Sequence, residues 1–93
     1  IKNAGRENDI LIVSVDGGCA GVRGVVDGSI GATSQQYPLL MASLGVQALY
    51  DVANGAEKPS GYTDTGVTLI TDNPVEGVES ENSEFGLANC WGE

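Results

Sequence analysis

The pattern of apolar and polar residues divides the chain into alternating strands and helices. An apolar run rich in β-branched residues predicts a strand over residues 9–15, and Asp16 and two glycines follow it. A run of this kind, bounded by glycine, is typical of a strand that is buried on both faces of a parallel sheet. Asp16 then stands at the carboxyl end of this strand, where ligands bind in open α/β sheets.

Two helices and two more strands are predicted after this first strand. Apolar residues at i, i+3 and i+4 spacing predict a short helix over residues 19–27 and a longer one over 38–54, whose stripe of leucine and methionine is expected to lie in the core. Strands are expected at 29–36 and 67–71. The order strand–helix–strand–helix–strand predicts an α/β fold with a parallel sheet flanked by helices.

The composition changes after residue 74. Residues 75–84 carry four glutamates with little periodicity, and a final apolar patch contains Cys90 and Trp91. We therefore expect residues 1–74 to form a partial α/β lobe that ends in a return strand. Residues 75–93 are expected to form an irregular acidic tail that docks through Cys90 and Trp91. Three strands are few for a parallel sheet, so the pattern is that of half a larger structure.

The charge and the residue types exclude several kinds of function. Thirteen acidic and four basic residues give a net charge of −9, which argues against a nucleic-acid partner. The chain has no histidine, and two cysteines cannot make a standard structural zinc site, so we expect neither a metal nor a cofactor. No leader and no apolar run near 18 residues is recognisable. No catalytic elbow or phosphate-binding loop is present, so we expect no enzymatic activity.

The two cysteines leave two alternatives open. Cys19 and Cys90 are either free thiols or partners in one disulfide, if the chain folds in an oxidising compartment. A bridge between them would close a loop of about 70 residues, worth roughly 4 kcal/mol in the chain-entropy model.

Two polar residues follow neighbouring strands and are candidates for ligand binding. Asp16 follows the first strand and Gln36 ends the second, so one ligand would reach both side chains, whereas Gln35 is expected to point away. A carboxylate accepts two hydrogen bonds, and an amide both donates and accepts, which suits a ligand with vicinal hydroxyls. The alternatives are a turn-capping role for Asp16 and a helix N-terminal role for Gln36.

The ordered set of runs resembles a known family. VSVDG at 13–17, ATSQQYP at 32–38 and TGVTLIT at 65–71, with the helices between them, resemble the C-terminal part of periplasmic sugar-binding proteins, the ribose-type receptors of bacterial ABC importers. The ending Cys90-Trp91-Gly92 and the pair Gly18-Cys19 are similar to the fructose-binding branch.

The resemblance implies a fold, a function and a set of site residues. It implies the C-terminal part of a type I periplasmic-binding-protein lobe, one of two that close over a monosaccharide of the fructose or ribose class. Asp16 and Gln36 match the family positions that bind sugar hydroxyls, and Cys19 and Cys90 would be bridged. The implied partners are a monosaccharide, the N-terminal portion of the same protein and a membrane permease, and the implied location is the periplasm. A sugar-sensing regulatory or chemoreceptor-coupled domain and a small α/β enzyme are the alternatives.

Overall fold

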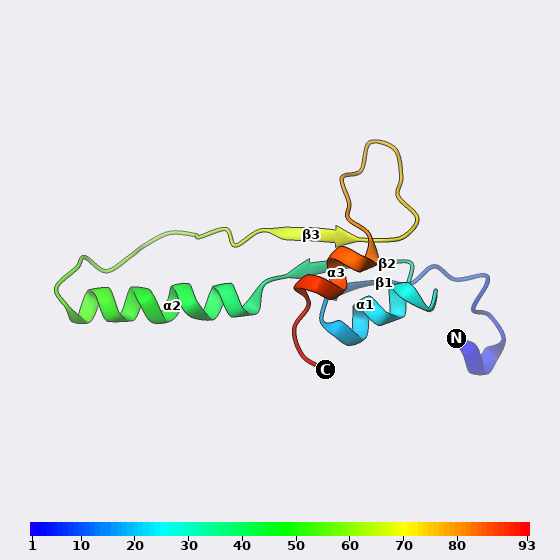
Figure 1. Ribbon diagram of the computed structural model, residues 1–93, viewed down its shortest axis with the longest axis horizontal. Helices are drawn as coiled ribbons and strands as arrows, with labels where there is room; N and C mark the ends of the chain where they lie inside the picture. The colour runs from blue at the N-terminus through cyan, green and yellow to red at the C-terminus, as the bar shows by residue number, and fades with distance from the viewer.

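The computed structural model describes all 93 residues as a small sheet with two short helices packed on it and one long helix that projects from it (Figure 1). The α/β class expected from the sequence is confirmed. In chain order the elements are η1 Lys2–Ala4, β1 Val13–Asp16, α1 Cys19–Val26, β2 Ala32–Gln36, α2 Pro38–Ala53, β3 Val67–Ile70 and α3 Ser83–Asn89.

The sheet has the order β1-β2-β3, with β2 in the centre. β1 and β2 are parallel and are connected through α1, whereas β3 is antiparallel to β2. The expectation of a wholly parallel sheet is therefore wrong. The path of the chain explains the difference, because α2 leads away from the carboxyl end of β2 and residues 54–66 return beside it (Figure 1). The chain thus enters β3 at the end of the sheet from which it left.

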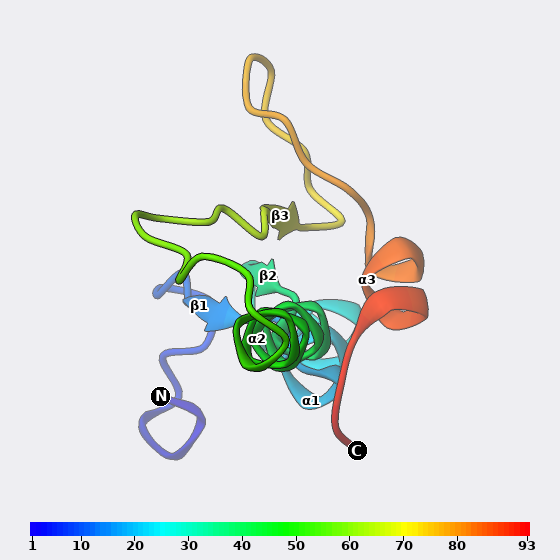
Figure 2. The ribbon, with the colours of Figure 1, turned by 90° about the vertical axis from the view of Figure 1, so that its left-hand side faces the viewer.

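The core lies on one face of the sheet, under α1 and α3 (Figure 2). Val22 of α1 and Ile70 of β3 are fully buried, and Val25 is nearly so. Thr33 and Gln35 of β2 point to the same side, where the Ser14 hydroxyl donates to the Thr33 hydroxyl at 2.8 Å. The hydrophobic core is consequently small, and polar residues fill much of this face.

The other face of β1 is open, so the expectation that this strand is buried on both faces is wrong. Val13 and Val15 are 61% and 73% exposed, and the strand is shorter than expected because residues 9–12 precede it as irregular chain. α1 and α3 lie together on the opposite side of the sheet (Figure 2).

The apolar stripe of α2 is also exposed, which corrects its assignment to the core. No residue of α2 is buried. The helix and the returning residues 54–66 extend the molecule to 59 × 30 × 22 Å, with a radius of gyration of 17.3 Å against about 12 Å for a compact chain of this length. The pattern identified the apolar residues correctly, but no element of this chain packs over them. Neither α2 nor any other helix combines the length and the apolar character that crossing a membrane requires.

The C-terminal region is more ordered than expected. α3 occupies residues that were assigned to an irregular tail, and the Asn82 side chain caps it by accepting a hydrogen bond from the Phe85 N–H at 2.9 Å. The disulfide is confirmed: Cys19 at the start of α1 is bonded to Cys90 just after α3, with their Cα atoms 5.0 Å apart. The bridge joins residues 71 positions apart and holds α3 against α1.

Gly86 tests how closely α3 packs on this core. A Cβ at this position would lie 2.9 Å from methyl carbons of both Ile70 and Val22. We expect Gly86→Ala to lower the free energy of unfolding by about 1–3 kcal/mol, since overpacking a tight contact costs that much. Gly45→Ala is the matched control in α2, where nothing lies within 4 Å of the added carbon.

Gly45→Ala should raise stability by about 0.5–1 kcal/mol through helix propensity alone. Chemical denaturation of the oxidised variants measures both effects. Equal stabilisation by the two substitutions would show that α3 does not pack against Ile70 and Val22.

Candidate functional site

Asp16 and Gln36, the two candidate ligand-binding residues, lie together in the structure. They occupy the carboxyl ends of the neighbouring parallel strands β1 and β2. The Gln36 Nε2 atom donates a hydrogen bond to the Asp16 Oδ1 atom. Asp16 is exposed and Gln36 is half-buried, so the pair is open to a ligand.

An unusual backbone conformation brings the Asp16 carboxylate to Gln36. Asp16 has a φ of +100°, and it is the one residue other than glycine with a positive φ. Its register partner is Gln35, and regular alternation would place both side chains on the covered face. The positive φ takes Asp16 out of this alternation, and its carboxylate meets Gln36 instead. Such a conformation costs on the order of 1–3 kcal/mol, which the surrounding contacts must offset.

Gln35 supports the turn that follows Asp16. It points away from Gln36 and is fully buried. Its Nε2 atom donates to the carbonyl oxygen of Gly17 at 2.8 Å and to that of Gly86 at 3.0 Å, whereas its Oε1 atom has no partner. Gly17 is also required sterically, because a Cβ there would collide with the Cα and Cβ atoms of Gln35 and its φ is +61°.

Trp91 encloses the same turn from the C-terminal side. Its carbonyl oxygen accepts a hydrogen bond from the Cys19 N–H at 3.0 Å, which satisfies a donor at the start of α1. Its ring lies against Gly18, where an added Cβ would be 3.8 Å from two ring carbons. The sequence predicted that Trp91 docks, but it did not connect Gln35 or Trp91 with Asp16. The sequence contained one signal for this connection. Gln35 is a polar residue on the covered side of its strand, and the neighbouring strand is followed by the glycine pair Gly17-Gly18.

The pair retains hydrogen-bonding capacity beyond its internal bond. The Asp16 carboxylate keeps its second oxygen and free lone pairs, and the Gln36 amide keeps one N–H and its oxygen. A small apolar hollow of about 250 Å³ begins at Tyr37, the next residue, and extends to Trp91. A ligand that combines hydroxyl groups with an apolar face therefore matches the chemistry of this end of the sheet.

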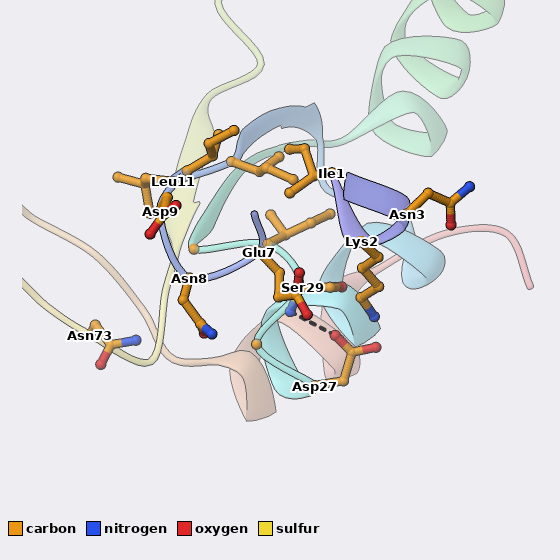
Figure 3. Close-up of a pocket in the computed structure, with 15 residues that line it drawn as sticks. Ile1, Lys2, Asn3, Glu7, Asn8, Asp9, Leu11, Asp27, Ser29 and Asn73 are labelled. Carbon is orange, nitrogen blue, oxygen red and sulfur yellow. Dashed lines mark hydrogen bonds between the residues drawn. The ribbon is translucent and has the colours of Figure 1, made fainter. Parts of the chain in front are cut away.

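The largest hollow lies at the opposite end of the sheet, between the N-terminal segment and the starts of β1 and β2 (Figure 3). Its volume is about 1190 Å³, and it contains neither Asp16 nor Gln36. Its two aspartates bond locally: Asp9 pairs with Arg6, and Asp27 accepts from the Ser29 N–H at 2.8 Å. Convergent groups at the carboxyl ends of the strands make the Asp16–Gln36 pair the better candidate site.

Asp27 has the one clearly perturbed carboxyl group. The Ser29 hydroxyl and the Ser29 backbone N–H lower the pKa of Asp27, with a smaller effect of the positive charge of Lys2. Figure 3 shows Asp27 facing Ser29 at the rim of the large hollow. The interaction stabilises the turn that connects α1 to β2.

Comparison with known proteins yields no relative. No protein-family model matches this chain, and neither a curated protein nor a solved structure is significantly similar to it.

The lowered pKa of Asp27 predicts a pH dependence. Because its pKa in the folded chain lies below the unfolded value, its contact with Ser29 stabilises the fold above the unfolded pKa. This contribution is lost as the pH falls through the folded pKa. We expect Ser29→Ala to raise the pKa of Asp27 toward its ordinary value, as measured by NMR titration of the carboxyl carbon.

Ser43→Ala is the control, because it removes a serine hydroxyl that donates to the Leu40 carbonyl and that has no effect on the pKa of Asp27. An unchanged Asp27 titration in Ser29→Ala would show that the Ser29 hydroxyl does not lower its pKa.

Proposed function

We propose that this chain supplies one wall of a monosaccharide-binding site in the solute-binding component of an ABC-type sugar importer. The observation that carries the proposal is the Asp16–Gln36 pair, in which a carboxylate and an amide from neighbouring strand ends meet at an open surface. The ligand class is a fructose- or ribose-type sugar.

The chemistry of the pair supports a sugar ligand. A monosaccharide presents vicinal hydroxyl groups that donate to a carboxylate and both donate to and accept from an amide. Hydrogen bonds to the ionised Asp16 are about twice as strong as neutral ones. A site of this kind rejects analogues without hydroxyls, because its own polar groups would lose their partners. Trp91 and Tyr37 offer nearby apolar surface to the C–H face of the ring.

The sequence resemblance and the disulfide support the same assignment. Asp16 and Gln36 match the sugar-binding positions of the ribose-type receptors, whose site lies between two lobes. In this proposal the chain belongs to one lobe, the N-terminal portion of the protein supplies the opposite wall, and a membrane permease receives the sugar. The Cys19–Cys90 disulfide is typical of exported proteins and favours a periplasmic receptor over a cytoplasmic regulator.

Because the chain supplies only one wall of the site, we expect it to bind sugar weakly by itself. Heteronuclear NMR on the oxidised 93-residue chain detects millimolar affinities and can therefore test this binding. Fructose or ribose should shift the amide signals of residues 16–18 and 36. Asp16→Asn should weaken binding at least about tenfold, the loss expected for a hydrogen bond to a charged group. Asparagine is chosen because it also tolerates a positive φ.

The matched control is Asp51→Asn on α2. Asp51 accepts a hydrogen bond from Gln47 at 2.8 Å, so the same chemical pair is altered far from the candidate site. This variant should bind sugar like the parent chain. The proposal fails if no sugar shifts the signals of residues 16–18, or if Asp16→Asn binds within a factor of two of the parent.

A further inference from the structure

The C-terminal residues 86–91, which we term the C-terminal clamp, are linked to residues 17–19 by two direct contacts with Cys19 and by one indirect contact through Gln35. Gly86 accepts from the Gln35 amide, which also holds Gly17. The Trp91 carbonyl accepts from the Cys19 N–H. Cys90 is bonded covalently to Cys19. All three contacts reach residues 17–19, which directly follow the residue with the strained backbone.

Gln35 connects the clamp to the turn through two hydrogen bonds of its side-chain amide. The two hydrogens of its Nε2 atom are used by Gly17 and Gly86, which are 69 residues apart in sequence but bridged by one amide. Gln35 is fully buried, so water does not replace either bond. If Gly86 moves away, the amide loses one of its two acceptors, and the bond to the Gly17 carbonyl is left as the only hydrogen bond that orients it.

The start of α1 adds no side-chain hydrogen bond that would hold the turn. Gly18 precedes α1 without any side-chain cap, and Gly17 and Gly18 have the widest conformational freedom of any residue type. The unfavourable φ of Asp16 therefore persists only while its neighbours hold it. The clamp is the part of the chain that covers Gly18 and, through Gln35, fixes the Gly17 carbonyl.

We infer that the C-terminal clamp is a redox-dependent positioning device, in which the Cys19–Cys90 disulfide, Gln35 and Trp91 hold Asp16 in the conformation that binds ligand. The clamp acts on the sugar site of the proposed function and rests on it. The chain then becomes competent to bind only after its thiols are oxidised, which couples binding to arrival in an oxidising compartment.

The chemical step is a two-electron reduction of one bond. A dithiol reductant gives two electrons and two protons, the Cys19–Cys90 bond breaks to two thiols, and the dithiol closes to its own disulfide. After reduction, only hydrogen bonds and packing hold residues 86–91 against α1, and α3 is seven residues long. Such a short helix is marginal without its covalent tether.

The experiment compares oxidised and dithiol-reduced chain by NMR. A positive φ gives a strong NOE between the amide proton and the α-proton of the same residue, and this signal at Asp16 reports the clamped conformation directly. We expect reduction to remove it and to weaken sugar binding at least tenfold. Cross-strand NOEs between β2 and β3 report whether the sheet remains folded.

A second variant keeps the proposal testable if the reduced chain unfolds. Gln35→Met retains the disulfide and the volume of the side chain but removes both hydrogen bonds, and it should also lose the Asp16 NOE and at least tenfold in affinity. Gln47→Met on exposed α2 is its control and should change neither. The double variant Cys19→Ser with Cys90→Ser should resemble the reduced chain and show no further response to dithiol.

The outcomes separate this inference from the proposed function. The clamp is disproved if Gln35→Met, folded and oxidised, keeps both the Asp16 NOE and its affinity. If the oxidised parent binds no sugar, the proposed function fails by itself, and the Asp16 NOE still decides whether the clamp positions this residue.

Discussion

The buried amide of Gln35 is the interaction on which the arrangement of the chain depends. Its Nε2 atom joins the turn after β1 to α3, while its backbone belongs to the central strand. Leaving a buried polar group unpaired costs about 1–3 kcal/mol, and the Oε1 atom of Gln35 is already unpaired. Loss of either remaining bond would add to this cost. A single side chain therefore fixes the relative positions of three segments that are distant in sequence: the turn after β1, the central strand β2 and α3.

This dependence on a polar contact reflects how little apolar surface the fold buries. Val22, Val25 and Ile70 are the buried hydrophobic residues, while the stripe of α2 and the outer face of β1 are exposed. The Cys19–Cys90 bridge, which spans 71 positions, is worth roughly 4 kcal/mol in the chain-entropy model, a large share of the stability of a small domain. The covalent bond and the Gln35 bonds act on the same two elements, α1 and α3, and on the turn between β1 and α1.

The candidate site at Asp16 and Gln36 depends on the same disulfide and Gln35 hydrogen bonds. Asp16 reaches Gln36 because its φ is +100°, and in the inferred clamp Gly17, Gln35 and the residues around Cys90 hold it in that conformation. The open side of the pair faces solvent, as expected for one wall of a cleft. The large hollow at the amino ends of the strands has more room, but its Asp9 and Asp27 carboxylates are already engaged in local contacts. Chemistry, rather than volume, identifies the candidate site.

The sequence by itself determined the positions of the main helices and strands, the placement of Asp16 and Gln36 at neighbouring strand ends, and the two cysteines available for a bridge. Periodicity and turn residues are local features, so they can be recognised in the sequence without knowledge of the tertiary structure. The tertiary structure alone decided the antiparallel direction of β3, the exposure of α2, the packing of α3 and the role of Gln35. A periodic pattern states which residues of an element share a face, but not which element covers that face. The direction of β3 depends on the path of residues 38–66, and the role of Gln35 depends on a carbonyl 51 residues away.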